Sequence, residues 1–152
     1  MTEPRPQPAP MPVDDETAAL IRHDLVNPIN LIVGYTDLLL GDLSGPDLAT
    51  ESSLLESIRD CGFLLLRRID GTLLVDGPGR STADVERLGR ALSGPTSLLV
   101  RQCDDLLELF AAKSAGGESV EFAEDIRKIR AAGLRMHELA EGLAAARLPG
   151  EE

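Results

Sequence analysis

Hydrophobic residues recur at steps of three and four along four long segments of the chain, a spacing that places them on one face of an α-helix. The first segment extends from Asp14 to about Gly41. Its apolar face consists of Leu25, Ile29, Ile32, Tyr35 or Thr36, and Leu39. Asp14, Asp15 and Glu16 place negative charge at its start, where the positive end of the helix macrodipole favours it. The pattern predicts a first helix over about 14–41.

Three further segments repeat this spacing and predict helices over about 48–75, 82–114 and 120–147. Breaks rich in Gly and Pro separate the segments, and residues 76–81 form the clearest of them. Residues 1–13 contain five prolines and predict a disordered Pro-rich tail. Four long helices joined by short loops are typical of an antiparallel up-down-up-down bundle. The predicted fold class is therefore all-α, an antiparallel four-helix bundle.

The two halves of the chain resemble each other, which indicates an internal duplication. Pro28 lies inside the first helical pattern, and Pro95 lies 67 positions later inside the third. The second and fourth patterns match at a spacing of 71: Ile58, Arg59, Gly62 and Gly71 correspond to Ile129, Arg130, Gly133 and Gly142. A proline inside a helix costs about 3 kcal/mol, so chance does not readily explain two at equivalent places. We expect two tandem helical hairpins, 14–75 and 82–148, joined by a linker at 76–81 into a single-chain pseudo-dimer.

The charge and the low aromatic content limit the classes of partner. The net charge at pH 7 is −11, which repels nucleic acid and anionic membrane surfaces. Aromatic residues make up only 3% of the chain, too few for the stacking platforms that single-stranded nucleic acid requires. We therefore expect neither a nucleic acid nor a membrane as a partner.

The chain has the features of a cytoplasmic protein. No apolar run reaches the roughly 20 residues of a membrane span, and residues 1–13 lack the apolar core of a signal peptide. Cys61 and Cys103 lie within apolar helical patterns and form no CxxC pair. They are expected to be reduced core thiols, and no metal-ligand spacing is present.

The candidate chemistry lies in the first helical segment, around His23. At about 100° per residue, His23 falls opposite the buried Ile32 and points to solvent, with Asn27 one turn below it. A neutral imidazole nitrogen can attack phosphorus if a nearby carboxylate, here Asp24, holds the proton of the other nitrogen. The amide of Asn27 can meet a phosphoryl group or an attacking water. Pro28 removes a backbone N–H and so leaves the Asp24 carbonyl without its usual helical donor.

These residues form a recognisable motif. The run His-Asp-Leu-Val-Asn-Pro, followed by Ile-x-x-Ile-x-Gly-Tyr-x-x-Leu-Leu, resembles the H-box of the dimerisation and phosphoacceptor (HisKA-type) domain of histidine kinases. The match covers residues 23–40 closely, and 57–74 resembles the second helix of that domain. In that family two hairpins, one from each subunit, form a four-helix bundle. The resemblance implies that His23 is the phosphoacceptor, Asp24 its acidic helper, and Asn27 the residue associated with dephosphorylating the partner regulator.

The second hairpin departs from this motif. The position equivalent to His23 is Arg90, which is followed by Ala91, and Gly94 stands where Asn27 would be. The chain also contains none of the Asn-rich and Gly-rich boxes of the kinases' ATP-binding domain. Self-phosphorylation is therefore not expected, and His23 is expected to be the single active histidine.

The favoured function is a histidine-containing phosphotransfer protein of a bacterial two-component phosphorelay. His23 would exchange a phosphoryl group with receiver aspartates of response regulators, or accept it from a separate histidine kinase. We expect Asn30, Gly34 and Asp37, on the outer strip below His23, to contact the receiver. The required Mg²⁺ would come with the receiver, and no cofactor is expected on this chain.

Two alternatives stay open: a receiver-binding regulator or phosphatase using Asn27, and a non-catalytic adaptor bundle. The sequence also leaves open the identity of the partner, the direction of phosphate flow, and a homodimer in place of a monomeric pseudo-dimer.

Overall fold

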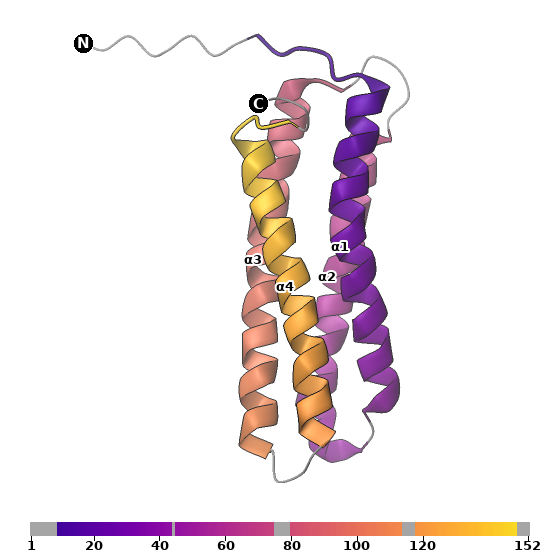
Figure 1. Ribbon diagram of the computed structural model, residues 1–152, viewed down its shortest axis with the longest axis vertical. Helices are drawn as coiled ribbons and strands as arrows, with labels where there is room; N and C mark the ends of the chain where they lie inside the picture. The colour runs from indigo at the N-terminus through magenta and orange to yellow at the C-terminus, as the bar shows by residue number, and fades with distance from the viewer. Residues whose placement is uncertain (1–8, 44, 75–79, 114–117, 149–152) are drawn as a thin grey trace, which may run out of the picture.

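The protein is a bundle of four long antiparallel helices, as predicted (Figure 1). The computed structural model describes residues 9–43, 45–74, 80–113 and 118–148. The helices are α1 (Asp15–Asp42), α2 (Ala49–Leu73), α3 (Thr82–Lys113) and α4 (Glu118–Ala144), and a short 3-10 helix, η1 (Pro46–Leu48), precedes α2. No β-strand occurs among these described residues.

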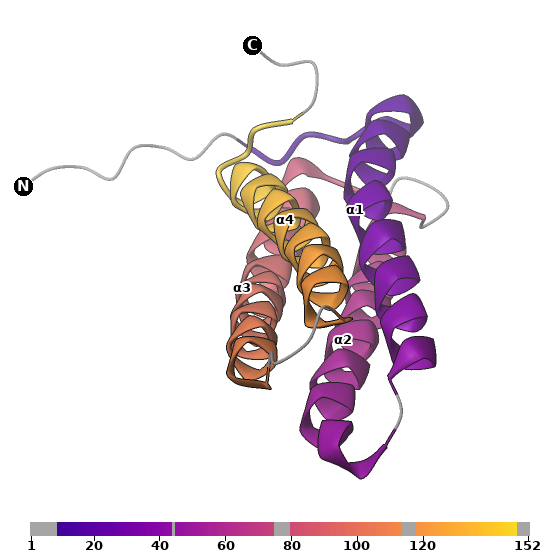
Figure 2. The ribbon, with the colours of Figure 1, turned by 60° about the horizontal axis from the view of Figure 1, so that its bottom comes forward.

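The helices occupy the corners of a square in chain order. α1 packs against α2 and α4, and α3 packs against the same two helices, so α1 and α3 are diagonal to each other (Figure 2). The predicted apolar face of α1 lies inside: Leu25, Ile29 and Leu39 are 1% exposed and Ile32 is fully buried. Thr36, not Tyr35, completes this face, because Thr36 is buried and donates its hydroxyl to the Ile32 carbonyl oxygen.

Local capping explains where α1 and α3 begin. The carboxylate of Asp14 accepts a hydrogen bond from the Thr17 N–H at 2.7 Å and so caps α1. At the start of α3, Asp84 Oδ2 accepts from the Ser81 N–H at 2.9 Å, while Ser81 Oγ accepts from the Asp84 N–H at 3.2 Å. This reciprocal pair is a capping box with Asp in place of the usual Glu.

The last residues of the segment predicted to be a disordered tail, 1–13, form hydrogen bonds with another part of the chain. The Val13 N–H donates to the Arg80 carbonyl oxygen at 3.1 Å, and the Thr82 N–H donates to the Met11 carbonyl oxygen at 2.8 Å. Prolines exclude a helix here but permit an extended segment, and Val13 gains burial, being only 8% exposed. The segment 11–13 thus pairs with the residues that lead into α3. Residues 1–8 and most of the predicted linker, 76–79, lie outside the described residues.

Each hairpin repeats the same packing contacts at positions that the spacings of 67 and 71 residues make equivalent. A Cβ on Gly62 would lie 3.0 Å from Val33 Cγ2, and one on Gly133 would lie 2.8 Å from Leu99 Cδ2 and 3.2 Å from Val100 Cγ2. The ion pairs that bridge the two helices of each hairpin are equivalent too. They are Asp37–Arg59, at 3.4 Å, and Asp104–Arg130, at 2.6 Å.

Candidate functional site

His23 lies on the outer surface of α1, near the end of the bundle where α2 finishes and α3 begins. Its side chain is 70% exposed, so the outward direction predicted from the helical spacing is correct. Asp24 Oδ1 lies 3.6 Å from His23 Nδ1, which is an ion-pair separation and slightly too long for a hydrogen bond. A carboxylate on this side favours a proton on Nδ1 and leaves the lone pair on Nε2, which faces away from Asp24.

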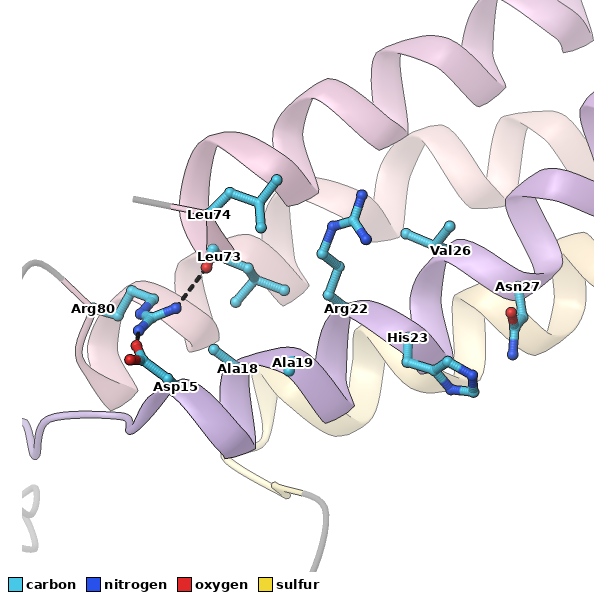
Figure 3. Close-up of a pocket in the computed structure, with 10 residues that line it drawn as sticks. All are labelled: Asp15, Ala18, Ala19, Arg22, His23, Val26, Asn27, Leu73, Leu74 and Arg80. Atoms are coloured by element: carbon cyan, nitrogen blue, oxygen red, sulfur yellow. Dashed lines mark hydrogen bonds and ion pairs between the residues drawn. The ribbon is translucent and has the colours of Figure 1, made fainter. Parts of the chain in front are cut away.

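Asn27 lies one helical turn beyond His23, and both side chains point away from α2 (Figure 3). Asn27 is exposed, as expected, and Pro28 is half-buried inside α1. The helix continues through Pro28 to Asp42, so the proline removes a donor without ending the helix. The imidazole of His23 and the amide of Asn27 therefore share one open surface.

The three residues expected to contact a partner extend this surface down α1. Asn30, Gly34 and Asp37 are all exposed. A Cβ on Gly34 would meet nothing within 4 Å, so no packing contact requires a glycine there. Asp37 is held by Arg59 of α2, whose Nη1 lies 3.4 Å from Asp37 Oδ1. The strip from His23 to Asp37 is thus continuous with the surface of α2.

A cavity of about 590 Å³ lies beside His23, between α1 and the end of α2 (Figure 3). It is lined by Asp15, Ala18, Ala19, Arg22, His23, Val26, Asn27, Leu73, Leu74 and Arg80. Neither this cavity nor its two arginines could be predicted from sequence, because the partners of the arginines come from other segments of the chain. Arg22 Nε lies 2.8 Å from Asp70 Oδ1 on α2. Arg80 donates to the Leu73 carbonyl oxygen at 2.7 Å and also pairs with Asp15.

The equivalent place in the second hairpin is built differently. Arg90, Ala91 and Gly94 are exposed on α3, where they stand in place of His23, Asp24 and Asn27. The residue equivalent to Arg22 is Gly89, and a Cβ there would lie 2.4 Å from the Ala144 N atom of α4. The helices α3 and α4 are therefore in backbone contact at the level where α1 and α2 enclose the cavity.

The other histidine and the two cysteines have structural surroundings. His137 Nδ1 lies 3.0 Å from Thr96 Oγ1, and His137 Nε2 lies 3.0 Å from Glu141 Oε1. Burial raises the pKa of the Cys61 thiol, and it raises that of Cys103 to about 12. Both thiols are therefore protonated at neutral pH and are poor nucleophiles. Within the described part of the chain, no group of three or more His, Cys, Asp or Glu side chains is placed to hold a metal ion.

Comparisons of the chain with models of protein families, with curated proteins and with solved structures found no match. None of the helices in the described segments combines the length and the apolar character needed to cross a bilayer.

Proposed function

We propose that the protein is a histidine phosphotransfer protein that carries a phosphoryl group on His23, in the manner of the histidine kinase domain that its H-box resembles. One observation carries the proposal: an exposed imidazole has a carboxylate facing Nδ1 and an exposed amide one turn away, on a surface open to a partner. A histidine with only a structural role, such as His137, is instead bonded at both ring nitrogens.

The geometry supports a simple exchange of the phosphoryl group with a receiver aspartate. The lone pair of Nε2 attacks phosphorus, the P–O bond to the receiver carboxylate breaks, and that carboxylate leaves with the electron pair. The imidazole gains positive charge while Nδ1 keeps its proton, and Asp24 at 3.6 Å offsets that charge. The reverse steps return the group to a receiver. The Mg²⁺ that neutralises the phosphoryl oxygens would be held by the receiver.

The receiver would dock on the strip formed by Asn30, Gly34 and Asp37 together with the adjacent surface of α2. Gly34 presents bare backbone to a partner, and no contact within the chain explains it. The Asp37–Arg59 ion pair connects this strip to the adjacent surface of α2.

The decisive experiment mixes the protein with receiver domains that carry a labelled aspartyl phosphate. We expect acid-labile label on the wild type and on His137→Ala, and none on His23→Ala. Absence of label on the wild type with every receiver of a broad panel, or equal label on His23→Ala, would refute the proposal.

A second candidate activity follows from the exposure of Asn27 beside the imidazole. Asn27 could orient a water against a receiver aspartyl phosphate, which would make the protein a receiver-binding phosphatase. An Asn27→Ala variant that still takes up phosphate at His23, but no longer speeds phosphate loss from the receiver, would favour this activity. Wild-type behaviour of both the His23 and the Asn27 variants would instead indicate a non-catalytic adaptor.

A further inference from the structure

The cavity beside His23 contains an arginine that the proposed transfer does not use. Arg22 precedes His23 in α1, and both residues border the cavity. Figure 3 shows Arg22 extending from α1 toward α2, where its Nε lies 2.8 Å from Asp70 Oδ1. Within the described segments, Arg22 donates a hydrogen bond to another residue only from Nε. The two terminal nitrogens of the guanidinium therefore remain as donors.

This arginine and its cavity occur in the hairpin that carries the histidine. In the second hairpin the equivalent residue is Gly89, where a Cβ would lie 2.4 Å from Ala144 N and 2.5 Å from the Ala140 carbonyl oxygen. A side chain of any length is excluded there. Arg22 and the open space next to it thus accompany His23, whereas the equivalent position next to Arg90 is closed against α4.

We propose that the cavity is a phosphate-binding subsite in which Arg22 exchanges the carboxylate of Asp70 for a phosphate dianion beside His23. The inference rests on the proposed function where the phosphate is the group attached to His23, but binding of free phosphate does not depend on it. The planar guanidinium fork matches phosphate oxygens in two parallel hydrogen bonds.

The surroundings of Arg22 allow this exchange. Its side chain is 36% exposed and its stem is flexible, so the guanidinium can turn from α2 toward the imidazole. In the unphosphorylated protein, the carboxylate of Asp70 balances the charge of the Arg22 guanidinium and holds it against α2. A phosphate on Nε2 carries about two negative charges and competes with the single charge of Asp70.

The second hairpin offers a matched control. Arg130 Nε pairs with Asp104 Oδ1 at 2.6 Å, and the Arg130 side chain is 37% exposed, close to the value for Arg22. Arg22→Gln removes the ion pair beside His23. Arg130→Gln removes a similar ion pair in the other hairpin, away from the cavity.

The first experiment titrates the unphosphorylated protein with inorganic phosphate and follows the His23 imidazole and arginine Nε resonances by NMR. We expect saturable shifts in the wild type and in Arg130→Gln, and affinity lower by about tenfold in Arg22→Gln, which loses charge-assisted hydrogen bonds. Asp70→Asn should bind phosphate more tightly, because it removes the competing carboxylate. Absence of saturable shifts, or unchanged affinity in Arg22→Gln, overturns binding of free phosphate.

The second experiment tests phosphate attached to His23, with phosphoramidate as a donor that needs no receiver. Nε2 attacks phosphorus, the P–N bond of the donor breaks, and the amine leaves with a proton as ammonia. We expect Arg22→Gln to slow labelling of His23 by about tenfold, with partial rescue by Arg22→Lys, which keeps the charge but loses the fork. Arg130→Gln should match the wild type. Equal rates in all variants overturn a role toward the attached group.

The two proposals fail in different ways. Phosphate binding that depends on Arg22, without any transfer from receivers to His23, leaves the subsite standing and refutes the phosphotransfer function. Wild-type transfer from receivers in Arg22→Gln, with no phosphate binding in the wild type, refutes the subsite and leaves the function standing.

Discussion

The chemistry proposed for His23 depends on the residue that follows it. Asp24 Oδ1 lies 3.6 Å from Nδ1, and the Asp24 side chain is 47% exposed, so water screens its charge in the isolated protein. A docked receiver would exclude that water and strengthen the interaction with the imidazolium formed during transfer. Under the proposed function, we therefore expect Asp24 to affect the rate of transfer more than the stability of the helix.

Replacing Asp24 with Asn tests this role, because the amide keeps the size of the side chain and removes its charge. We expect transfer from a phosphorylated receiver to His23 to slow by about 10- to 100-fold. Quenched-flow labelling measures this rate, and circular dichroism should show unchanged helicity. The same substitution at Asp104, on α3 and away from His23, serves as the control. Transfer at the wild-type rate in Asp24→Asn would contradict the role.

The helical glycines divide into two kinds, and Gly34 and Gly89 represent them. A Cβ on Gly34 has open space, whereas one on Gly89 would lie 2.4 Å from the α4 backbone. We expect Gly34→Ala to raise the free energy of unfolding by about 0.5–1 kcal/mol, since alanine is the better helix former. Gly89→Ala should lower it by about 1–3 kcal/mol through overpacking. Urea denaturation measures both changes. Changes in the free energy of unfolding with the same sign in the two variants would contradict the difference in packing between the two sites.

At the scale of the elements, the sequence pattern predicted the helices well because each has one apolar face of sufficient length. Leu25, Ile29 and Ile32 are buried where the period of 3.6 places them. The same pattern could not predict contacts that depend on how two helices meet. The Arg22–Asp70 ion pair and the cavity between α1 and α2 depend on how these two helices pack against each other. Likewise, Glu51, which is fully buried in α2, pairs with Lys113 of α3 at 2.8 Å because of how α2 and α3 meet.

Asp14 and Asp84, which cap α1 and α3, should make the stability of these helices depend on pH in the acidic range. Hydrogen bonds from Thr17 hold the pKa of Asp14 below its ordinary value of 3.8. Burial alone would raise the pKa of Asp84, but hydrogen bonds from Ser81 and Arg87 outweigh it and lower that pKa. A lowered pKa in the folded state contributes stability that is present above the unfolded value and lost as the pH falls through the folded one.

We therefore expect the capped helices to lose stability as the pH falls below about 4. The double variant Asp14→Ser, Asp84→Gln keeps side chains that can cap but removes both titrations, so its melting temperature should fall less between about pH 5 and about pH 3 than that of the wild type. Thermal unfolding followed by circular dichroism makes the comparison. Identical pH profiles for the two proteins would show that these caps do not contribute to the acid response.

At the scale of the whole molecule, the two hairpins combine similar packing with different surfaces. Gly62 and Gly133 approach equivalent residues of the neighbouring helix, and equivalent ion pairs bridge each hairpin. Side chains that bridge the hairpins also match: Lys128 lies 5.1 Å from the centre of the Tyr35 ring, and at the equivalent positions Gln102 donates to Ser57 Oγ at 2.8 Å. The outer residues differ, because Arg90 and Gly94 stand at the positions equivalent to His23 and Asn27. A single chain thus supplies both hairpins of a bundle but only one candidate reactive surface.

This asymmetry leads to a prediction about stoichiometry. A bundle assembled from two identical hairpins presents two phosphoacceptor surfaces, whereas this chain should carry one phosphoryl group and bind one receiver. Native mass spectrometry of the protein with excess phosphorylated receiver should show one added phosphate per chain in the wild type and none in His23→Ala, with a complex of one receiver to one chain. Two receivers on one chain would mean that the α3 surface still docks receivers despite Arg90 and Gly94. A complex built on two chains would instead indicate that hairpins exchange between molecules or that the protein forms a homodimer.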